Sequence, residues 1–381
     1  MNEHANHSCT STVFVMAVIM VCSLAVAAQP PESTDTTHAT APIVDTMPFE
    51  HVFILGLQGD ASAALVFLDT LDGRTLTPRQ RDLKAKFYAR FRAMDETPQY
   101  ATTDTAVISL LDLYRDYWRA SLLDNTHQEK HDNLLTDAVI DYLLGHSDRY
   151  DSLPPTDLRE NFPDYLQQFL MQRGVYAATG KTGSLFDLLL HTSETEHVYT
   201  VATPEERIDV KVVFMDSIVS NGWEEYATFG KYYPGGWATS DALYCVAGSY
   251  DLESENFTVS YLKHEGKHFA DYKKFPELSG PDLEYRAKLV ELSAAEQRLQ
   301  KLLSFFLSNS SDDRSNPHGF ANRCVMRDLS LAFGRDSLVT DRAWWQTQPA
   351  DEIHRHAVTL LKKNTAALMR AGADTVSVYI E

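Results

Sequence analysis

The run His264-Glu265-Gly266-Lys267-His268 combines residue types and a spacing that could support metal chemistry. On a helix, residues four apart lie on one face, so the imidazoles of His264 and His268 can hold one metal ion together. Glu265 directly follows the first histidine and can reach a water on that ion. Two nitrogen ligands and a carboxylate base beside a metal-activated water are the components of hydrolysis assisted by one Zn²⁺ ion.

A catalytic zinc site takes three protein ligands, and a second predicted helix over 283–302 offers candidates for the third. Glu284 and Glu291 are seven residues apart, and therefore lie on nearly one face of that helix. We expect Glu284 to be the third ligand, because it begins the helix just after the turn Gly280-Pro281-Asp282. Ala287 would let the two helices approach closely. Glu291 is the alternative ligand.

Two further residues of the first helix need an interpretation. Asp271 would rise about 10 Å along the helix from His264, too far to share one tetrahedral ion. We expect it on the solvent face, with a hydrogen bond to a ligand histidine as the alternative. Gly266 costs the helix roughly 1 kcal/mol relative to alanine. Close approach of a neighbouring strand or of substrate would explain it, and so would a neutral substitution.

The constellation of His264, Glu265, His268 and Glu284 resembles the gluzincin group of zinc metallopeptidases, in which a downstream glutamate completes an H-E-x-x-H site. The phrase Glu284-Tyr-Arg-Ala also resembles the E-x-x-A around the third ligand in several such families. The metzincin pattern fails, because Asp271 and Lys274 occupy its glycine and its last histidine. The resemblance covers about thirty residues and the preceding strand. Fifteen residues separate His268 from Glu284, fewer than in thermolysin-like enzymes.

The resemblance implies that Zn²⁺ polarises the scissile carbonyl of a peptide or protein substrate and acidifies the attacking water. Glu265 would take the proton of that water and pass it to the leaving amine. The strand around Ala242–Gly248 would lie along the cleft and could pair with an extended substrate. Candidate donors to the oxyanion are Tyr250, Tyr261, Arg286, His318, His354 and His356.

The surroundings of the motif favour a strand, a turn and then a helix. Tyr244–Tyr250 is rich in aromatic and β-branched residues, as strands are. Asp251–Asn256 offers several helix caps and acids for a first turn. Pro276 should end the metal-bearing helix, with Phe275 in an extended conformation.

Composition excludes some functions and bounds the fold. The chain has 381 residues, 44% of them hydrophobic and 23% charged, which suffices for two globular domains. A formal net charge of −19 argues against nucleic acid and against an anionic membrane surface as partners.

The apolar run Phe14–Ala28 ends in Ala25-Val26-Ala27, which is typical of a cleaved signal peptide. We therefore expect residues 1–28 to direct the protein to the periplasm or outside the cell, without stable membrane insertion afterwards. An N-terminal membrane anchor is the alternative, although the run is short for a membrane span. After cleavage Cys245 and Cys324 remain, either as a disulfide or as two separate buried thiols.

The rest of the sequence divides into three parts. Residues 29–46 are rich in Pro, Thr and Ala and indicate a flexible linker. Residues 47–192 are predicted to be a helical N-terminal domain, and residues 193–381 a zincin-like catalytic domain. Helical spacing marks Ala61–Leu71, Pro78–Phe91, Ala106–Leu123, Leu134–Leu144, Phe162–Gln172, Gly183–Leu190 and Asp351–Arg370.

The second half contains the strand signals. Val198–Ala202 and Ile208–Phe214 flank a turn and predict a hairpin, and Thr375–Ile380 predicts a short terminal strand. The fold class is therefore α+β: mostly helical, with a small sheet beside the H-E-x-x-H helix. A zinc-dependent metallopeptidase is the leading hypothesis. The alternatives are a non-catalytic helical binding or assembly protein with an incidental or structural metal, and a zinc hydrolase of other amides or esters.

Overall fold

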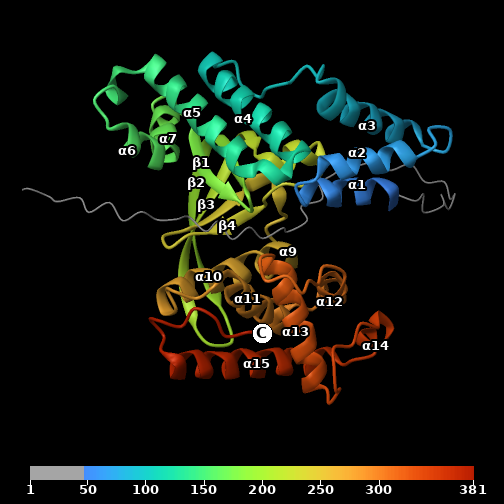
Figure 1. Cartoon of the computed structure of the whole chain (residues 1–381). Coiled ribbons are helices and arrows are strands. Elements are labelled where there is room, and N and C mark those ends of the chain that lie inside the picture. The colour runs from blue at the N-terminus through green and yellow to red at the C-terminus, as the bar shows by residue number, and fades with distance from the viewer. Residues whose placement is uncertain (1–46) are drawn as a thin grey trace, which may run out of the picture.

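The computed structural model describes residues 47–381, so the expected signal peptide and linker lie outside the described residues. The fold is α+β and mostly helical, as the sequence predicts. A curled five-stranded sheet occupies the middle of the molecule. The N-terminal helices gather at one end of this sheet and the C-terminal helices at the other (Figure 1).

In the described part of the chain, seven α-helices precede the sheet. The predicted helices at 61–71, 106–123 and 162–172 are confirmed almost to the residue. The capping-box bonds between Thr77 and Gln80 begin the third helix, with Pro78 at its first position. Tyr114 and Trp118 are buried in the core, as expected. The helices are α1 (Met47–Leu57), α2 (Ala61–Thr70), α3 (Pro78–Tyr88), α4 (Thr105–Leu123), α5 (Gln128–His146), α6 (Pro155–Glu160) and α7 (Phe162–Met171).

The sheet has the strand order β1-β2-β3-β5-β4. β3 and β5 run parallel, and the other neighbouring pairs are antiparallel. The predicted hairpin is confirmed, with Ala202 opposite Arg207 at its tip. The strands are β1 (Tyr176–Thr182), β2 (Leu185–Ala202), β3 (Arg207–Asn221), β4 (Gly236–Ala238) and β5 (Leu243–Val246).

The helix predicted over Gly183–Leu190 is wrong, because this segment begins β2. Leu188 and Leu190 are buried against the N-terminal helices, whereas Leu189 belongs to a different apolar cluster. A strand covered on both faces has a continuous apolar run, which periodicity cannot distinguish from a helix. The domain boundary expected between residues 192 and 193 falls inside this strand.

The predicted long helix over 283–302 is wrong, since it is two helices with a break after Ala294. The carboxylate of Glu255 accepts hydrogen bonds from three backbone N–H groups at this break, those of residues 296–298. The helices of this half are α8 (Trp223–Thr228), α9 (Glu255–Thr258), α10 (Leu262–Lys274), α11 (Gly280–Ala294), α12 (Leu299–Ser308), α13 (Pro317–Ala332), α14 (Arg342–Gln346) and α15 (Ala350–Ala371).

The strand predicted at Thr375–Ile380 is also wrong, because this segment has no strand partner in the described part of the chain. Backbone N–H groups of Tyr379 and Ile380 donate to Oδ1 of Asp282, a buried residue on α11. A side chain thus satisfies the backbone that a neighbouring strand would otherwise satisfy.

Cys245 and Cys324 are both free, so the alternative of two separate buried thiols is correct. Cys245 packs in the core between α10 and the sheet, and Cys324 packs in the core of the C-terminal helices. Among the helices of residues 47–381, none is both long and apolar enough to cross a membrane.

Candidate metal centre

Helix α10 carries the H-E-x-x-H motif and packs against the sheet. Tyr261, Leu262 and Phe269 join the same core as Val212 and Cys245 on the strands. The helix ends at Lys274, just before Phe275 and Pro276, as the sequence predicts. Burial of this apolar side fixes the rotation of the helix, and the opposite side faces α11.

Gly266 lets β2 approach this helix closely. A methyl group added at Gly266 would lie 3.1 Å from Cγ1 of Val201. That separation is tighter than ordinary van der Waals contact, so the neighbouring strand leaves little room for a side chain. Close approach of a strand therefore explains the glycine.

Three side chains converge between α10 and α11, as the sequence predicts. One ligand atom from each of His264, His268 and Glu284 lies within 4.8 Å of the others. The Nε2 atoms of the two histidines are 3.1 Å apart. Nε2 of His268 lies 3.2 Å from Oε1 of Glu284, and Nε2 of His264 lies 3.5 Å from Oε2. All three side chains are fully buried.

These separations fit a single zinc ion. Zinc bonds to nitrogen and carboxylate oxygen are about 2.0–2.2 Å long, so ligand atoms at tetrahedral angles lie about 3.4 Å apart. Both carboxylate oxygens of Glu284 are fully buried, and a buried carboxylate is stable only beside positive charge. A metal ion here would add to the charges of the basic side chains that flank this carboxylate. Two imidazole nitrogens and one carboxylate also leave a coordination position open, as catalytic zinc sites do.

Glu291, the alternative third ligand, meets the other nitrogen of His264. Its Oε1 forms a short hydrogen bond with Nδ1 of that imidazole, on the side away from His268 and Glu284. A carboxylate in this place fixes the ring and makes the ligand nitrogen more basic. Both glutamates therefore contact His264: Glu284 lies beside the nitrogen that could bind a metal, and Glu291 holds the opposite nitrogen of the ring.

Two basic side chains flank Glu284 on its Oε2 atom. Nδ1 of His318 lies 2.8 Å away and Nζ of Lys288 lies 3.3 Å away. Burial opposes ionisation of Glu284, but the charges of His318, Lys288 and His264 outweigh it and lower the pKa of Glu284 well below its usual value. The carboxylate is thus held ionised, which is the form that binds a cation.

The ionisation of the remaining site residues depends on burial and on these carboxylates. Burial disfavours charge on His264, but Glu291 and Glu284 outweigh it and raise the pKa of His264 to about 10. Burial is the main reason that the pKa of His268 is lowered. Burial raises the pKa of Glu265 to about 8, against the opposing effect of His264. A bound dication would favour the neutral imidazole and the ionised carboxylate in each case.

The expected solvent position of Asp271 is wrong, because this carboxylate is fully buried. It accepts two hydrogen bonds from Arg286, of 2.7 and 3.0 Å, and lies 3.0 Å from Nζ of Lys267. The alternative contact with a ligand histidine is also absent, since Nδ1 of His268 has no hydrogen-bond partner among the described residues. The positive charges of Lys267, one turn earlier on α10, and of Arg286 on α11 compensate the cost of burying this carboxylate.

The expectation that the strand around Ala242–Gly248 pairs with an extended substrate is wrong. β5, within the expected segment Ala242–Gly248, pairs with β3 on one side and β4 on the other. Both of its edges are used, so it cannot pair with a substrate. The edge strand beside β5 is β4, which has only three residues, Gly236–Ala238, and gave no strand signal. The Ala238 N–H group lies close enough to Glu265 to lower its pKa slightly.

Most of the candidate oxyanion donors are engaged elsewhere. The Tyr261 hydroxyl donates to the carbonyl of Tyr244, and Arg286 donates to Asp271 and Asn364. His354 contacts the carbonyl of Ala295, outside the cluster. The other candidates are Tyr250, which packs in the core under the sheet, His318, which faces Glu284, and His356, which packs on Phe333.

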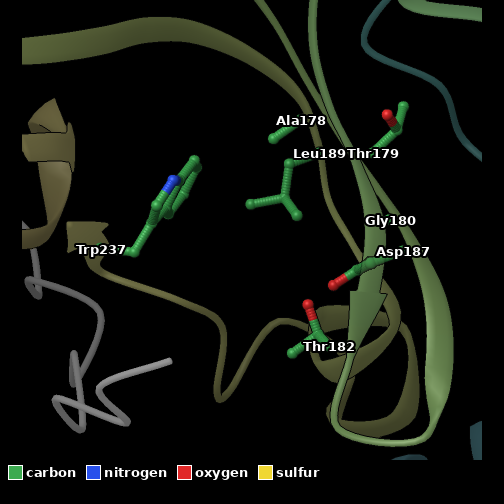
Figure 2. A pocket seen from close by; sticks show the side chains of 7 residues that line it. All are labelled: Ala178, Thr179, Gly180, Thr182, Asp187, Leu189 and Trp237. Carbon is green, nitrogen blue, oxygen red and sulfur yellow. The ribbon is translucent and has the colours of Figure 1, made fainter. Parts of the chain in front are cut away.

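A separate hollow is lined by residues of β1 and β2 and by Trp237 of β4 (Figure 2). Trp237 and Leu189 form its apolar wall, and the Thr182 hydroxyl points toward the Asp187 carboxyl. Asp187 is buried and accepts hydrogen bonds from the N–H groups of Leu188 and Trp223. It holds the start of α8 against β2 and takes no part in the metal centre.

No protein-family model, no curated protein and no solved structure matches this chain. The geometry of the described residues is therefore the basis for inferring what the protein does.

Proposed function

We propose that the protein is a zinc-dependent metallopeptidase of the gluzincin type, with His264, His268 and Glu284 as the metal ligands and Glu265 as the general base. The observation that carries this proposal is the convergence of ligand atoms from His264, His268 and Glu284. Beside them lies the buried carboxylate of Glu265, whose oxygens have no hydrogen-bond partner among the described residues. The ligand separations of 3.1, 3.2 and 3.5 Å suit zinc.

Glu265 is placed to move a proton in this reaction. When bound, Zn²⁺ supplies the positive charge that polarises a scissile carbonyl and acidifies a water. Both oxygens of Glu265 are buried and accept no hydrogen bond that meets normal geometry within residues 47–381. Its carboxylate can therefore accept the proton of the attacking water and deliver it to the leaving nitrogen.

β4 offers a way to hold an extended substrate. Within the described residues β4 pairs with β5 alone, so the outer edge of this buried strand has no strand neighbour and could accept one. Contacts between α10 and β4 bring this edge to the metal centre. A peptide added there would pass its carbonyl groups along the site.

The test combines metal content with a matched pair of variants. The purified protein is expected to contain one zinc ion per chain at neutral pH and to cleave members of a mixed peptide library. Glu265→Gln should keep the zinc and lose at least 10²-fold in kcat, because the general base is removed. Glu277→Gln, an exposed glutamate beyond the same helix, is the control and should cleave normally.

The alternatives predict different results. Zinc bound without cleavage of peptides, amides or esters would identify a binding protein with a structural metal. Cleavage confined to the amide and ester panel would identify another kind of zinc hydrolase. A protein without zinc would remove the enzyme hypothesis.

A further inference from the structure

Tyr272 is a half-buried residue of α10 that the reaction described so far does not use. It lies one helical turn after His268, on the same face. The two rings are nearly parallel, at an interplanar angle of 17°, with their centroids 6.2 Å apart. The phenol ring therefore packs beside the imidazole of a proposed metal ligand.

The Tyr272 hydroxyl is buried and has no hydrogen-bond partner among the described residues. A buried hydroxyl without a partner costs about 1–3 kcal/mol, so its retention needs an explanation. A phenol is protonated at neutral pH. This hydroxyl, on the helix face that carries both histidines, therefore has a proton that it can donate.

The reaction needs a donor of this kind. Attack of water on a peptide carbonyl places negative charge on the carbonyl oxygen, and a preorganised hydrogen bond stabilises that charge. The hydroxyl of Tyr261 and the guanidinium of Arg286 are already engaged, and His354 bonds outside the site. Among these side chains, Tyr272 combines a neighbouring position with an unused proton.

We propose that Tyr272 is a catalytic residue whose hydroxyl donates a hydrogen bond to the oxyanion that develops on the scissile carbonyl oxygen. This inference rests on the proposed hydrolysis. No bond to Tyr272 forms or breaks, and its proton remains on the phenol oxygen throughout. The residue lies within the H-E-x-x-H helix and donates from the side of α10 that faces α11.

The test uses zinc-loaded wild-type protein and Tyr272→Phe, with Tyr150→Phe as a control from the N-terminal helices. Tyr150 is a buried tyrosine, and its hydroxyl bonds to the carbonyl of Tyr165. On a peptide that the wild type cleaves, Tyr272→Phe should lower kcat about 10²–10³-fold and leave KM within about threefold, because the lost contact exists only in the transition state. Tyr150→Phe should change neither constant.

A second readout needs no turnover. Phenylphosphonate presents a tetrahedral oxyanion, and calorimetry should show that it binds Tyr272→Phe at least tenfold more weakly than wild type. A chelator titration should show equal zinc affinity in both proteins. Equal phosphonate affinity in both proteins would overturn the proposal, and so would a matching loss of zinc affinity, which would make Tyr272 a ligand or a purely structural residue. If zinc and phosphonate bind as expected but no peptide is cleaved, the peptidase proposal fails and the assignment of the donor stands.

Discussion

Glu284 and Glu291 occupy one helix, yet they meet opposite nitrogens of the His264 ring. Glu284 shares the Nε2 side with His268, and Glu291 holds Nδ1. The proposed ligand and the residue that supports the ring can therefore be tested separately, although both side chains are glutamates seven positions apart. The difference comes from where each turn of α11 faces α10.

Substitution of these two glutamates should separate the roles. Glu284→Ala removes the proposed third ligand and should abolish retention of zinc through dialysis. Glu291→Gln removes the charge that supports His264 and should weaken zinc binding about 10–100-fold while keeping one site per chain. Competition with a chromophoric chelator measures both affinities. Stronger loss in Glu291→Gln than in Glu284→Ala would mean that the ligand and the support have been interchanged.

Asp187 gives a pH-dependent prediction away from the metal. Burial is the main cause that raises the pKa of Asp187 to about 6. The negative charge of Glu225 raises this pKa further. The unfolded value is near 3.9, so the folded state binds the proton more tightly between about pH 4 and 6. This group therefore stabilises the fold at low pH, and its contribution is lost as the pH rises through about 6.

Replacement by an uncharged isostere should remove this dependence. Between pH 4.5 and 7.5 the free energy of unfolding of Asp187→Asn, relative to wild type, should rise by about 2 kcal/mol, since about 1.4 of the roughly two pKa units of the shift are lost over this range. Urea unfolding at the two pH values measures the difference. Asp209→Asn, at an exposed position of β3, is the control. A relative stability that does not change with pH would show that the Asp187 carboxyl titrates as it does in the unfolded chain.

At the scale of elements, α10 could be predicted from the sequence and β4 could not. The H-E-x-x-H spacing, the apolar positions and Pro276 together define a helix with a fixed metal-facing side. β4 has three residues among glycines and aromatic residues, too few for any periodicity to appear. The leucines at 188–190 fit a helix and a doubly buried strand equally well, and only pairing with β1 and β3 decides between them.

The contact between α10 and β2 predicts an outcome for Gly266. In an open helix, glycine to alanine gains about 1 kcal/mol of stability. Here the new methyl group would meet Cγ1 of Val201 at 3.1 Å. We expect Gly266→Ala to gain clearly less than 1 kcal/mol, and to show about the full gain when Val201→Ala is also present. Equal gains in the two backgrounds, measured by urea unfolding, would mean that β2 does not confine this face of the helix.

At the scale of the whole molecule, the β2–β3 hairpin joins the two ends of the fold. Its tip reaches the C-terminal helices, where Glu205 lies 2.9 Å from Nζ of Lys267 and 3.3 Å from Arg286. Arg286 also donates to Asn364 and Thr365 of α15. These partners are separated by 62 to 81 residues in sequence, so no local pattern could predict that they meet.

This buried network should be worth far more than an exposed ion pair. Arg286→Met would leave Asp271 and Glu205 buried with Lys267 as their remaining cation, and breaking a buried pair in this way costs about 3–5 kcal/mol. Lys211→Met breaks an exposed pair with Glu196 on the same hairpin and should cost under about 1 kcal/mol.

Urea unfolding of both variants in low and high salt separates the two cases. Salt should shrink the already small Lys211 effect and leave the Arg286 effect nearly unchanged, because buried charges are poorly screened. Comparable losses in the two variants, equally reduced by salt, would mean that water reaches the hairpin tip. The ion pairs of Glu205 with Lys267 and Arg286 would then not hold α10 in place, and the position of this helix would depend on its packing against the sheet alone.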